Sequence, residues 1–166
     1  MTTGSGANAP ESPSTLETVG PLQGARRAGA AMDANDAAAR FMGMELEENR
    51  PGFAQLSLTV TGEMINGVDV CHGGFIFALA DTAMAHASNS RNQVSVAASA
   101  GIEFLRPTVA GDRLTARAEE GALVGRNGIY DVSVVNQNGD LIALFRGKTR
   151  TIKGAIVPDM RISEQG

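Results

Sequence analysis

The chain has 166 residues with a formal net charge of −4 at pH 7, and 43% of its residues are hydrophobic. This length and composition suffice for one core, so we expect a single domain. The acidic balance and the 4% aromatic content argue against nucleic-acid binding as the main role. No apolar run approaches the length of a bilayer span, and the first thirty residues lack the hydrophobic core of a secretory signal. We therefore expect a cytoplasmic protein without a membrane partner.

Cysteine and histidine are too rare for a disulfide or a clustered metal centre. Cys71 is the single cysteine, which excludes an internal disulfide, and His72 and His86 are the only histidines. Because a zinc site needs a cluster of such ligands, we predict no metal, no redox chemistry and no bound cofactor.

The first part of the chain predicts a tail and a short helix. Residues 1–22 are rich in Gly, Ser, Thr, Ala and Pro, which bury too little apolar surface to offset the entropy of ordering, so we predict a flexible tail. Residues 28–41 are mostly Ala with polar spacers, and Gly43 follows as a C-terminal stop. This pattern predicts an amphipathic helix anchored by Phe41 and Met42.

The middle of the chain predicts one strand and one long helix. Residues 54–61 alternate between apolar and polar side chains, which is typical of a strand with one buried face. In residues 73–88, large apolar side chains and five alanines cover nearly every side of a helix. We therefore expect this helix to be buried almost all round.

The remainder of the chain predicts four more strands, separated by turn residues such as the pair Asn138-Gly139. These strands cover residues 95–105, 113–123, 128–136 and 141–152. One hydrophobic helix followed by an uninterrupted series of strands does not alternate as parallel βαβ units do, so we predict an α+β fold in which an antiparallel sheet covers a central helix. The domain is expected over residues 23–153, with a poorly packed tail at 154–166.

Asp81 is the only charged residue in the core of the predicted long helix. An ionised carboxylate in apolar surroundings costs several kcal/mol unless it is paired or hydrogen-bonded. Two interpretations stay open from this segment alone. Asp81 is either a core carboxylate that bonds to a neighbouring strand or to the Thr82 hydroxyl, or a catalytic base or nucleophile.

The start of the same helix offers backbone donors. His72, Gly73 and Gly74 leave N–H groups free at the positive helix end, where they suit an oxyanion, although two glycines are also common in ordinary turns and caps. Eight residues separate Gly73 from Asp81, which is about 12 Å along a helix axis. If both act on one bond, antiparallel helices of a symmetric dimer must bring Asp81 of one subunit to Gly73 of the other.

The motifs around these residues resemble hotdog-fold thioesterases of the phenylacetate-degradation (PaaI) type. The pattern is Asn66-Gly67, Cys71-His72-Gly73-Gly74 and Leu79-Ala80-Asp81-Thr82, followed by IEFLRP, AGD and YDVSVVNQNGDLIALFRGKTR. The resemblance covers roughly residues 40–153, and these combined motifs are more specific than a lone His-Gly-Gly. It implies a curved antiparallel sheet wrapped around one central helix, with protomers joining their sheets into dimers and then a homotetramer.

The resemblance also implies roles for individual residues. Asp81 is the catalytic carboxylate, Gly73 the backbone donor to the thioester carbonyl, and Asn66 a polar partner near that carbonyl. Ser99 matches a position that helps to orient the attacking water. We expect attack by water that Asp81 activates, or by the carboxylate itself.

Substrate binding is expected around the helix start and on exposed cations. His72 either hydrogen-bonds the substrate or holds the turn, and Gly74 allows close approach. Cys71 next to His72 suggests a nucleophilic pair, but sequence neighbours rarely point together, so a packing role is favoured. The cations Arg106, Lys148 and Arg150 are candidates for the phosphates of coenzyme A, with ordinary surface roles as the alternative. Lys148 and Arg150 share a strand face with Arg146.

These inferences predict an acyl-CoA thioesterase, with an aromatic acyl group such as phenylacetyl or hydroxyphenylacetyl preferred by the resemblance. Coenzyme A is then part of the substrate. Two alternatives remain: a hotdog dehydratase or isomerase that uses His72 with Asp81, and a non-catalytic acyl-CoA-binding protein. A buried Asp81 argues against the second, because binding alone gains little from its cost.

Overall fold

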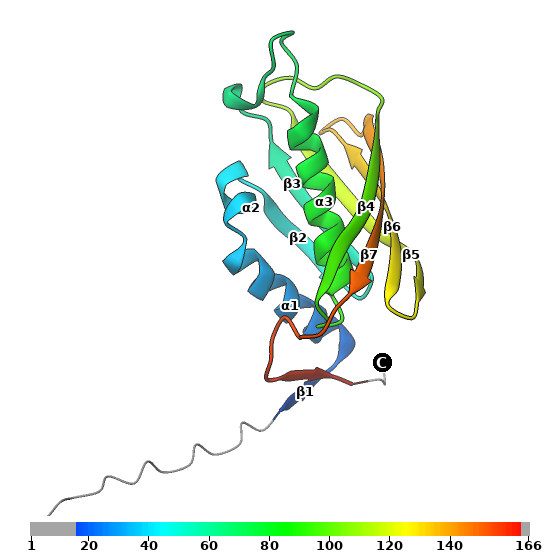
Figure 1. Ribbon diagram of the computed structural model, residues 1–166. Helices are drawn as coiled ribbons and strands as arrows, with labels where there is room; N and C mark the ends of the chain where they lie inside the picture. The colour runs from blue at the N-terminus through cyan, green and yellow to red at the C-terminus, as the bar shows by residue number, and fades with distance from the viewer. Residues whose placement is uncertain (1–15, 164–166) are drawn as a thin grey trace, which may run out of the picture.

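A six-stranded antiparallel sheet curves around one long helix in the computed structural model, which describes residues 16–163 (Figure 1). The helices are α1 (Pro21–Asn35), α2 (Ala37–Met42), α3 (Gly73–Asn89) and the short 3-10 helix η1 (Gly62–Met64). The strands are β1 (Glu17–Val19), β2 (Glu45–Arg50), β3 (Phe53–Thr59), β4 (Ser95–Phe104), β5 (Arg113–Val124), β6 (Asn127–Val135), β7 (Leu141–Thr151) and β8 (Met160–Ile162). The sheet order is β2-β3-β5-β6-β7-β4. The predicted α+β architecture is confirmed.

The five predicted strands form close to their predicted positions. Ala54, Leu56 and Leu58 of β3 are each at most 1% exposed, so the predicted apolar face is buried. The strands β4 to β7 match their predicted ranges to within about two residues at each end, which is the usual disagreement between definitions. The predicted turn after β6 is also confirmed, because Gly139 has a φ of 83° that suits glycine.

The strand β2 was not predicted, because its sequence ELEENR lacks an apolar face. Its position at the sheet edge requires pairing only with β3. Charged groups supply further contacts: Arg113 on β5 donates to Glu45 at 3.0 Å and to Glu47 at 2.8 Å. Pairing between strands far apart in sequence therefore creates a strand that local periodicity does not indicate.

The predicted helix over residues 28–41 is two helices rather than one. The break falls at Asp36, whose backbone is extended and whose carboxylate accepts a hydrogen bond from Ala39 N at 2.9 Å, so it begins α2. Gly43 ends α2 in the left-handed conformation, as predicted. The prediction that Phe41 anchors this helix was wrong, because its side chain is 87% exposed, while Met42 does pack against the core.

The two ends of the described chain pair with each other. Strands β1 and β8 form a parallel two-stranded sheet, and Met160 is buried. Residues 17–19 and 160–162 therefore belong to strands rather than to the predicted tails, because each strand supplies the other's hydrogen-bonding partners, and residues 21–22 already belong to α1. Residues 154–159 are described and form no helix or strand, whereas residues 1–15 and 164–166 lie outside the described residues.

Helix α3 has one buried face and one open face. Its large buried side chains, such as Ile76, Leu79 and Met84, pack against the sheet. The opposite face, which includes Gly74 and Asp81, is exposed or half-buried, so the expectation of burial all round was wrong for a single chain. No helix among residues 16–163 is long and apolar enough to cross a membrane.

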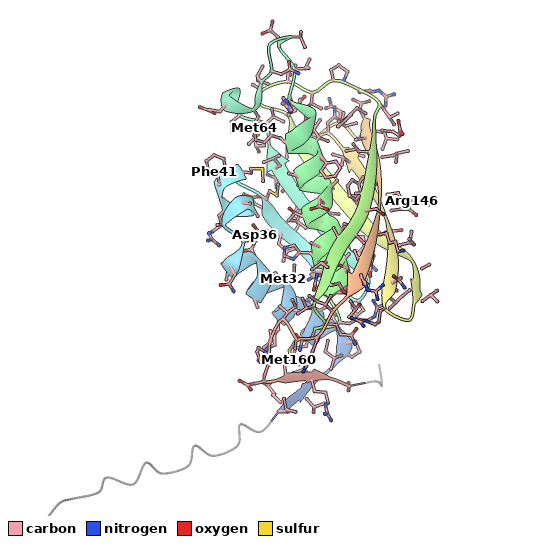
Figure 2. The ribbon with its side chains drawn as sticks, viewed as in Figure 1. Met32, Asp36, Phe41, Met64, Arg146 and Met160 are labelled. Atoms are coloured by element: carbon pink, nitrogen blue, oxygen red, sulfur yellow. The ribbon has the colours of Figure 1, made fainter. Side chains whose placement is uncertain are left out.

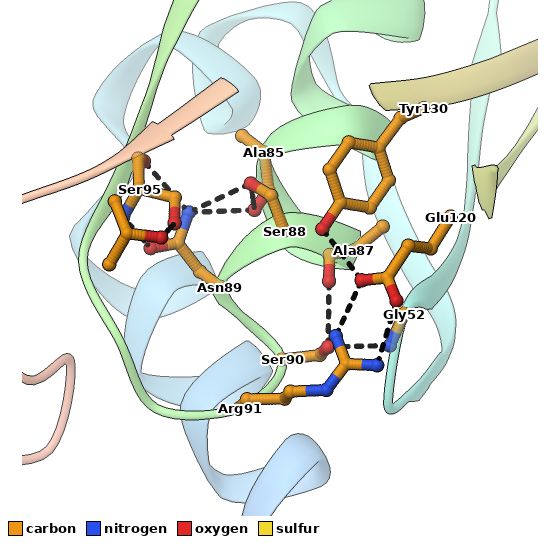
Figure 3. Close-up of polar contacts among 11 residues, drawn as sticks. Gly52, Ala85, Ala87, Ser88, Asn89, Ser90, Arg91, Ser95, Glu120 and Tyr130 are labelled. Atoms are coloured by element: carbon orange, nitrogen blue, oxygen red, sulfur yellow. Dashed lines mark hydrogen bonds and ion pairs between the residues drawn. The ribbon is translucent and has the colours of Figure 1, made fainter. Parts of the chain in front are cut away.

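The C-terminal end of α3 is held by a dense polar network (Figure 3). The Arg91 guanidinium donates two hydrogen bonds to Glu120, at 2.6 and 3.0 Å, and the Tyr130 hydroxyl donates a third at 2.9 Å. The Asn89 side chain donates to the carbonyl of Ser95 at 3.1 Å and accepts from its N–H at 2.8 Å. These bonds join the helix end to β4, β5 and β6 and leave the N-terminal end to other roles.

Candidate active site

The N-terminal end of α3 presents one free backbone donor. The His72 imidazole Nδ1 accepts the N–H of Gly74 at 3.0 Å, so His72 caps the helix and holds the turn. Among the described residues, no acceptor meets the N–H of Gly73, which lies at the first helical position. Of the two predicted glycine donors, Gly73 is therefore the one left available at the positive end of the helix.

An aromatic ring covers Gly73 and explains why this position has no side chain. A Cβ atom there would lie 2.8 Å from the Cζ atom of Phe104 at the end of β4. Both residues line a hollow of about 370 Å³ together with Arg106. The motifs did not single out Phe104, since its contact with Gly73 joins segments that are distant in sequence.

Arg106 lies beside the same hollow without a salt bridge in the described chain. Its guanidinium donates to the carbonyl of Leu141 at 2.8 Å, and the side chain is exposed. The surface ion pair considered as an alternative is thus not formed. A cation held close to Gly73 is suited to an anionic part of a ligand.

Asp81 lies on the open face of α3, two turns beyond Gly73. Its carboxylate forms no hydrogen bond or ion pair within residues 16–163, and the Thr82 hydroxyl does not bond to it. Partial burial raises the pKa of the Asp81 carboxyl above its usual range. The structure therefore does not support the interpretation of Asp81 as a core carboxylate that is hydrogen-bonded within its own chain. An unpaired carboxylate of this kind is typical of a functional site.

Asn66 lies in the loop before α3, where its side chain shapes a tight turn. Its Oδ1 atom accepts the N–H of Val68 at 2.9 Å and that of Val70 at 3.4 Å. A bridge between Ile65 and Cys71 closes this loop at the helix start. The Nδ2 atom has no partner among the described residues, which leaves it able to donate to a ligand.

Cys71 and His72 do not form a nucleophilic pair. The thiol of Cys71 is buried and burial raises its pKa, which disfavours the reactive thiolate. Its Sγ atom lies 3.7 Å from the carbonyl oxygen of His72, while the His72 ring is bonded to Gly74 instead. Cys71 belongs to the hydrophobic core cluster, in agreement with the packing role.

Ser99, Lys148 and Arg150 lie away from the helix start. Ser99 is opposite Lys148 in the β4–β7 ladder and five residues from Phe104, about 17 Å along a strand. Arg150 is opposite Val96, further still from Phe104. Neither Lys148 nor Arg150 forms an ion pair in the described chain, whereas Arg146 is bound to Asp131 through two hydrogen bonds, of 2.6 and 2.9 Å.

The predicted site residues therefore fall into two groups within one chain. The first group surrounds the N-terminus of α3: Asn66, His72, Gly73, Gly74 and Arg106. The second lies along the middle and far part of α3, β4 and β7: Asp81, Ser99, Lys148 and Arg150. Strand β4 is the last strand of the sheet, so its outer edge has no partner, and most of its residues are exposed.

Known proteins are similar to this chain in sequence and fold. A family model described as Thioesterase superfamily matches residues 69–143. The acyl-coenzyme A thioesterase PaaI of Escherichia coli (strain K12) is 47% identical over 126 residues, which are 76% of this chain and 90% of that protein. A putative esterase of Archaeoglobus fulgidus is 35% identical over 113 residues, or 68% of this chain and 73% of the relative. The solved structure of the E. coli PaaI protein from the phenylacetic acid degradation operon has a TM-score of 0.80 and 42% identity, and the match covers 86% of this chain and 99% of that chain.

The curved sheet, its central helix and the free donor at the helix start define a hotdog-fold protein of the thioesterase class. The chain belongs to the thioesterase superfamily, and within it to the acyl-CoA thioesterases of the PaaI type. The resemblance seen in the sequence motifs is confirmed. The relatives named above are a thioesterase and a putative esterase, which supports a thioesterase over the alternatives of a dehydratase, an isomerase or a non-catalytic binding protein.

Proposed function

We propose that this acyl-CoA thioesterase hydrolyses an aromatic acyl-CoA, with Asp81 as the base or nucleophile and Gly73 N–H as the donor to the thioester carbonyl. The observation that carries the proposal is the unpaired carboxylate of Asp81 on the open face of the helix whose N-terminus leaves Gly73 N–H free. The aromatic acyl group is supported by the relative from the phenylacetic acid degradation operon.

Either of two routes completes the reaction. In the first, the Asp81 carboxylate takes a proton from water, the hydroxide attacks the carbonyl carbon, and the C–S bond breaks to release the thiol of coenzyme A. In the second, the carboxylate attacks the carbonyl carbon, the C–S bond breaks to release the thiolate of coenzyme A, and water hydrolyses the resulting anhydride and supplies the proton that the thiolate takes up. In both, the Gly73 N–H stabilises the negative charge that develops on the carbonyl oxygen.

A complete site requires two subunits. Asp81 and Gly73 of one chain are about 12 Å apart along the helix axis, too far to act on one carbonyl. Pairing of two β4 edges about a two-fold axis would continue the sheet and set the open faces of the two α3 helices against each other. Asp81 and Ser99 of one subunit would then meet Gly73 and Asn66 of the other. Assembly of two dimers into a tetramer and the cytoplasmic location stay predictions.

Coenzyme A is part of the substrate in this proposal, and no separate cofactor takes part. Arg106 at the helix start, and Lys148 and Arg150 of the partner, are the cations that lie free to meet its phosphates. Arg146 is a poor candidate because Asp131 already binds its guanidinium.

Thiol release tests the role of Asp81. We expect turnover of phenylacetyl-CoA and of several aliphatic acyl-CoAs by the wild type, and a decrease of at least about 100-fold in kcat for Asp81→Asn. Glu119→Gln, an exposed carboxylate on β5, serves as the matched control and should retain activity. An Asp81→Asn protein as fast as the wild type would refute the assignment.

Mixed dimers test the shared site. Subunits carrying Asp81→Asn and subunits carrying Gly73→Val should each be inactive alone. A mixed dimer contains one intact site, so we expect about half of the wild-type activity per mixed dimer. Mixed dimers of confirmed composition that stay inactive would contradict the two-subunit arrangement.

A further inference from the structure

The loop between η1 and α3 contains one of the three Asn-Gly pairs of the chain, which are Asn66-Gly67, Asn127-Gly128 and Asn138-Gly139. In such a pair the backbone nitrogen of the glycine can attack the side-chain amide carbon of the asparagine, because glycine places no side chain in the way. Figure 2 shows this loop beside the start of α3, directly after η1, whose Met64 is labelled. The surroundings of each pair decide how readily the attack occurs.

Gly67 has the most accessible attacking nitrogen of the three glycines. Its N–H forms no hydrogen bond among residues 16–163, and the residue is exposed. The N–H of Gly139, in contrast, donates to the carbonyl of Asn136 at 3.0 Å. Gly128 is buried in β6, which pairs with β5 on one side and with β7 on the other. Of the three pairs, only Asn66 is therefore followed by a peptide that is free to turn toward the preceding side chain.

The side chain of Asn66 is arranged as this reaction requires. Its Oδ1 atom accepts the N–H groups of Val68 at 2.9 Å and of Val70 at 3.4 Å. Attack on the Cγ atom moves negative charge onto Oδ1, and these two donors stabilise that charge. The Nδ2 atom, which leaves as ammonia, is held by no acceptor in the described chain. The side chain of Asn138 accepts no hydrogen bond among the described residues and lacks this activation.

We propose that Asn66 is a site of spontaneous deamidation and that this modification lowers the activity of the enzyme. A bond forms between the Gly67 nitrogen and Asn66 Cγ, the bond from Cγ to Nδ2 breaks, and ammonia leaves with the amide proton. The product is a succinimide. Water then opens this ring at either carbonyl and leaves aspartate or isoaspartate at position 66. Water is the only co-reactant.

The effect on activity rests on the proposed function, because it needs the thioester carbonyl at Gly73. The free Nδ2 atom of Asn66 can donate to a ligand, whereas an ionised carboxylate at the same position can only accept. The added negative charge also opposes the charge that develops on the carbonyl oxygen during attack. An isoaspartate in addition lengthens the backbone of the turn that leads into α3. We expect kcat/KM to decrease at least about tenfold in a modified site.

The test follows the three pairs over time in the full chain at mildly alkaline pH. Peptide mass spectrometry measures conversion at each asparagine, and we expect Asn66 to convert first, Asn138 more slowly and Asn127 last. Gly67→Ala is the matched variant. An added Cβ there has no atom within 4 Å, and Gly67 has no left-handed φ, so fold and initial activity should be kept. The new methyl group hinders the attack and should slow conversion at Asn66.

Thiol release from phenylacetyl-CoA is measured on the same samples. Wild-type activity should decrease in step with conversion at Asn66, while Gly67→Ala keeps its activity for longer. Asn66→Asp, which carries the new charge from the start, should show the low activity before any incubation. Thermal unfolding midpoints check that each variant is folded.

The outcomes separate the modification from the function on which its effect rests. If Asn66 stays intact while Asn138 converts, the modification site is wrong. If Asn66 converts without a decrease in thiol release, or if Gly67→Ala loses activity as fast as the wild type, the effect on activity is wrong. A fresh wild type that releases no thiol from any acyl-CoA refutes the proposed function, and the mass spectra still decide whether Asn66 is modified.

Discussion

The two ends of helix α3 differ in how completely their polar groups are hydrogen-bonded. At the C-terminal end, Glu120 accepts three hydrogen bonds, and Asn89 bonds in both directions to β4 (Figure 3). At the N-terminal end, Gly73 N–H has no acceptor in the described chain, and a hollow lies beside it. The carboxylate of Asp81, midway between, has no partner there either.

This difference shows how one helix serves both stability and chemistry. Groups that are fully paired stabilise the fold but have no capacity left for a ligand. Groups left unpaired cost free energy, and such a cost is typical of functional sites in otherwise consistent structures. Stability is thus expected to depend on the C-terminal end and activity on the N-terminal half, which the following changes test.

The largest expected effect is on activity, at the N-terminal end. Gly73→Val places side-chain atoms where the Phe104 ring lies, because even a Cβ would be 2.8 Å from it. The valine side chain would block access to the backbone N–H, which the substitution leaves in place, so we expect roughly a hundredfold loss of kcat/KM, similar in size to the removal of an oxyanion donor. The unfolding midpoint should change little, because Phe104 is half-exposed and its ring can turn away. Thiol release and thermal unfolding measure both, and a stable, fully active variant would contradict the assignment of Gly73.

The next effect is on stability, at the C-terminal end. Glu120→Ala removes the shared acceptor of Arg91 and Tyr130 and leaves the largely buried tyrosine hydroxyl without its partner. Because Arg91 is partly exposed, we expect a loss of about 2 kcal/mol in the free energy of unfolding. Denaturant unfolding measures it, with the exposed neighbour Glu119→Ala as control. Activity per folded molecule should remain unchanged. A loss of that activity would contradict the view that stability depends on the C-terminal end of α3 and activity on its N-terminal half.

A smaller effect concerns the pH dependence of catalysis. Burial raises the pKa of Asp81 above the 3.8 of an exposed aspartate, and both proposed routes need the ionised form. We expect kcat/KM to decrease about tenfold per pH unit below that raised pKa. Burial favours the protonated form in the fold, so the contribution of Asp81 to stability decreases as the pH rises through its pKa. An activity profile that stays flat through the acid range would exclude Asp81 as base or nucleophile.

The smallest effect tests one exception at the well-paired end. His86 is buried in α3, and neither ring nitrogen has a partner in the described structure. Burial lowers the pKa of His86, although Asp33 and Asp36 act against the shift. The unfolded chain therefore takes up the proton first, and stability decreases as the pH falls through about 6.5.

Replacing His86 removes the free-energy cost of burying its two ring nitrogens without hydrogen-bond partners. We expect His86→Leu to raise the free energy of unfolding by about 1 kcal/mol at pH 7, and by more at pH 5. Denaturant unfolding at both pH values measures the change. A loss of stability of equal size at pH 7 and pH 5 would show that His86 packs in a way that leucine cannot replace and that its titration is irrelevant.

Several features were predictable because they leave a periodic or positional mark on the sequence. Residues 54–61 alternate, and residues 73–88 are apolar around one charged residue, so β3 and α3 could be placed closely. Gly43 and Gly139 have left-handed backbone conformations that few other residues tolerate, so the end of α2 and the last hairpin could be predicted. The need for a second subunit followed from helix rise alone and remains a prediction.

Other features depend on contacts between distant segments, which leave no local pattern. The sequence of β2 is typical of a charged loop, and it becomes a strand by pairing with β3. In the same way, β1 and β8 are strands because they pair with each other. The exposure of Phe41, the ring of Phe104 over Gly73 and the lack of a partner for Asp81 likewise became visible only in three dimensions. The sequence determined which groups are chemically able to act on a thioester. The tertiary structure alone decided which of them are left unpaired, because hydrogen bonds and packing between distant segments occupy the others.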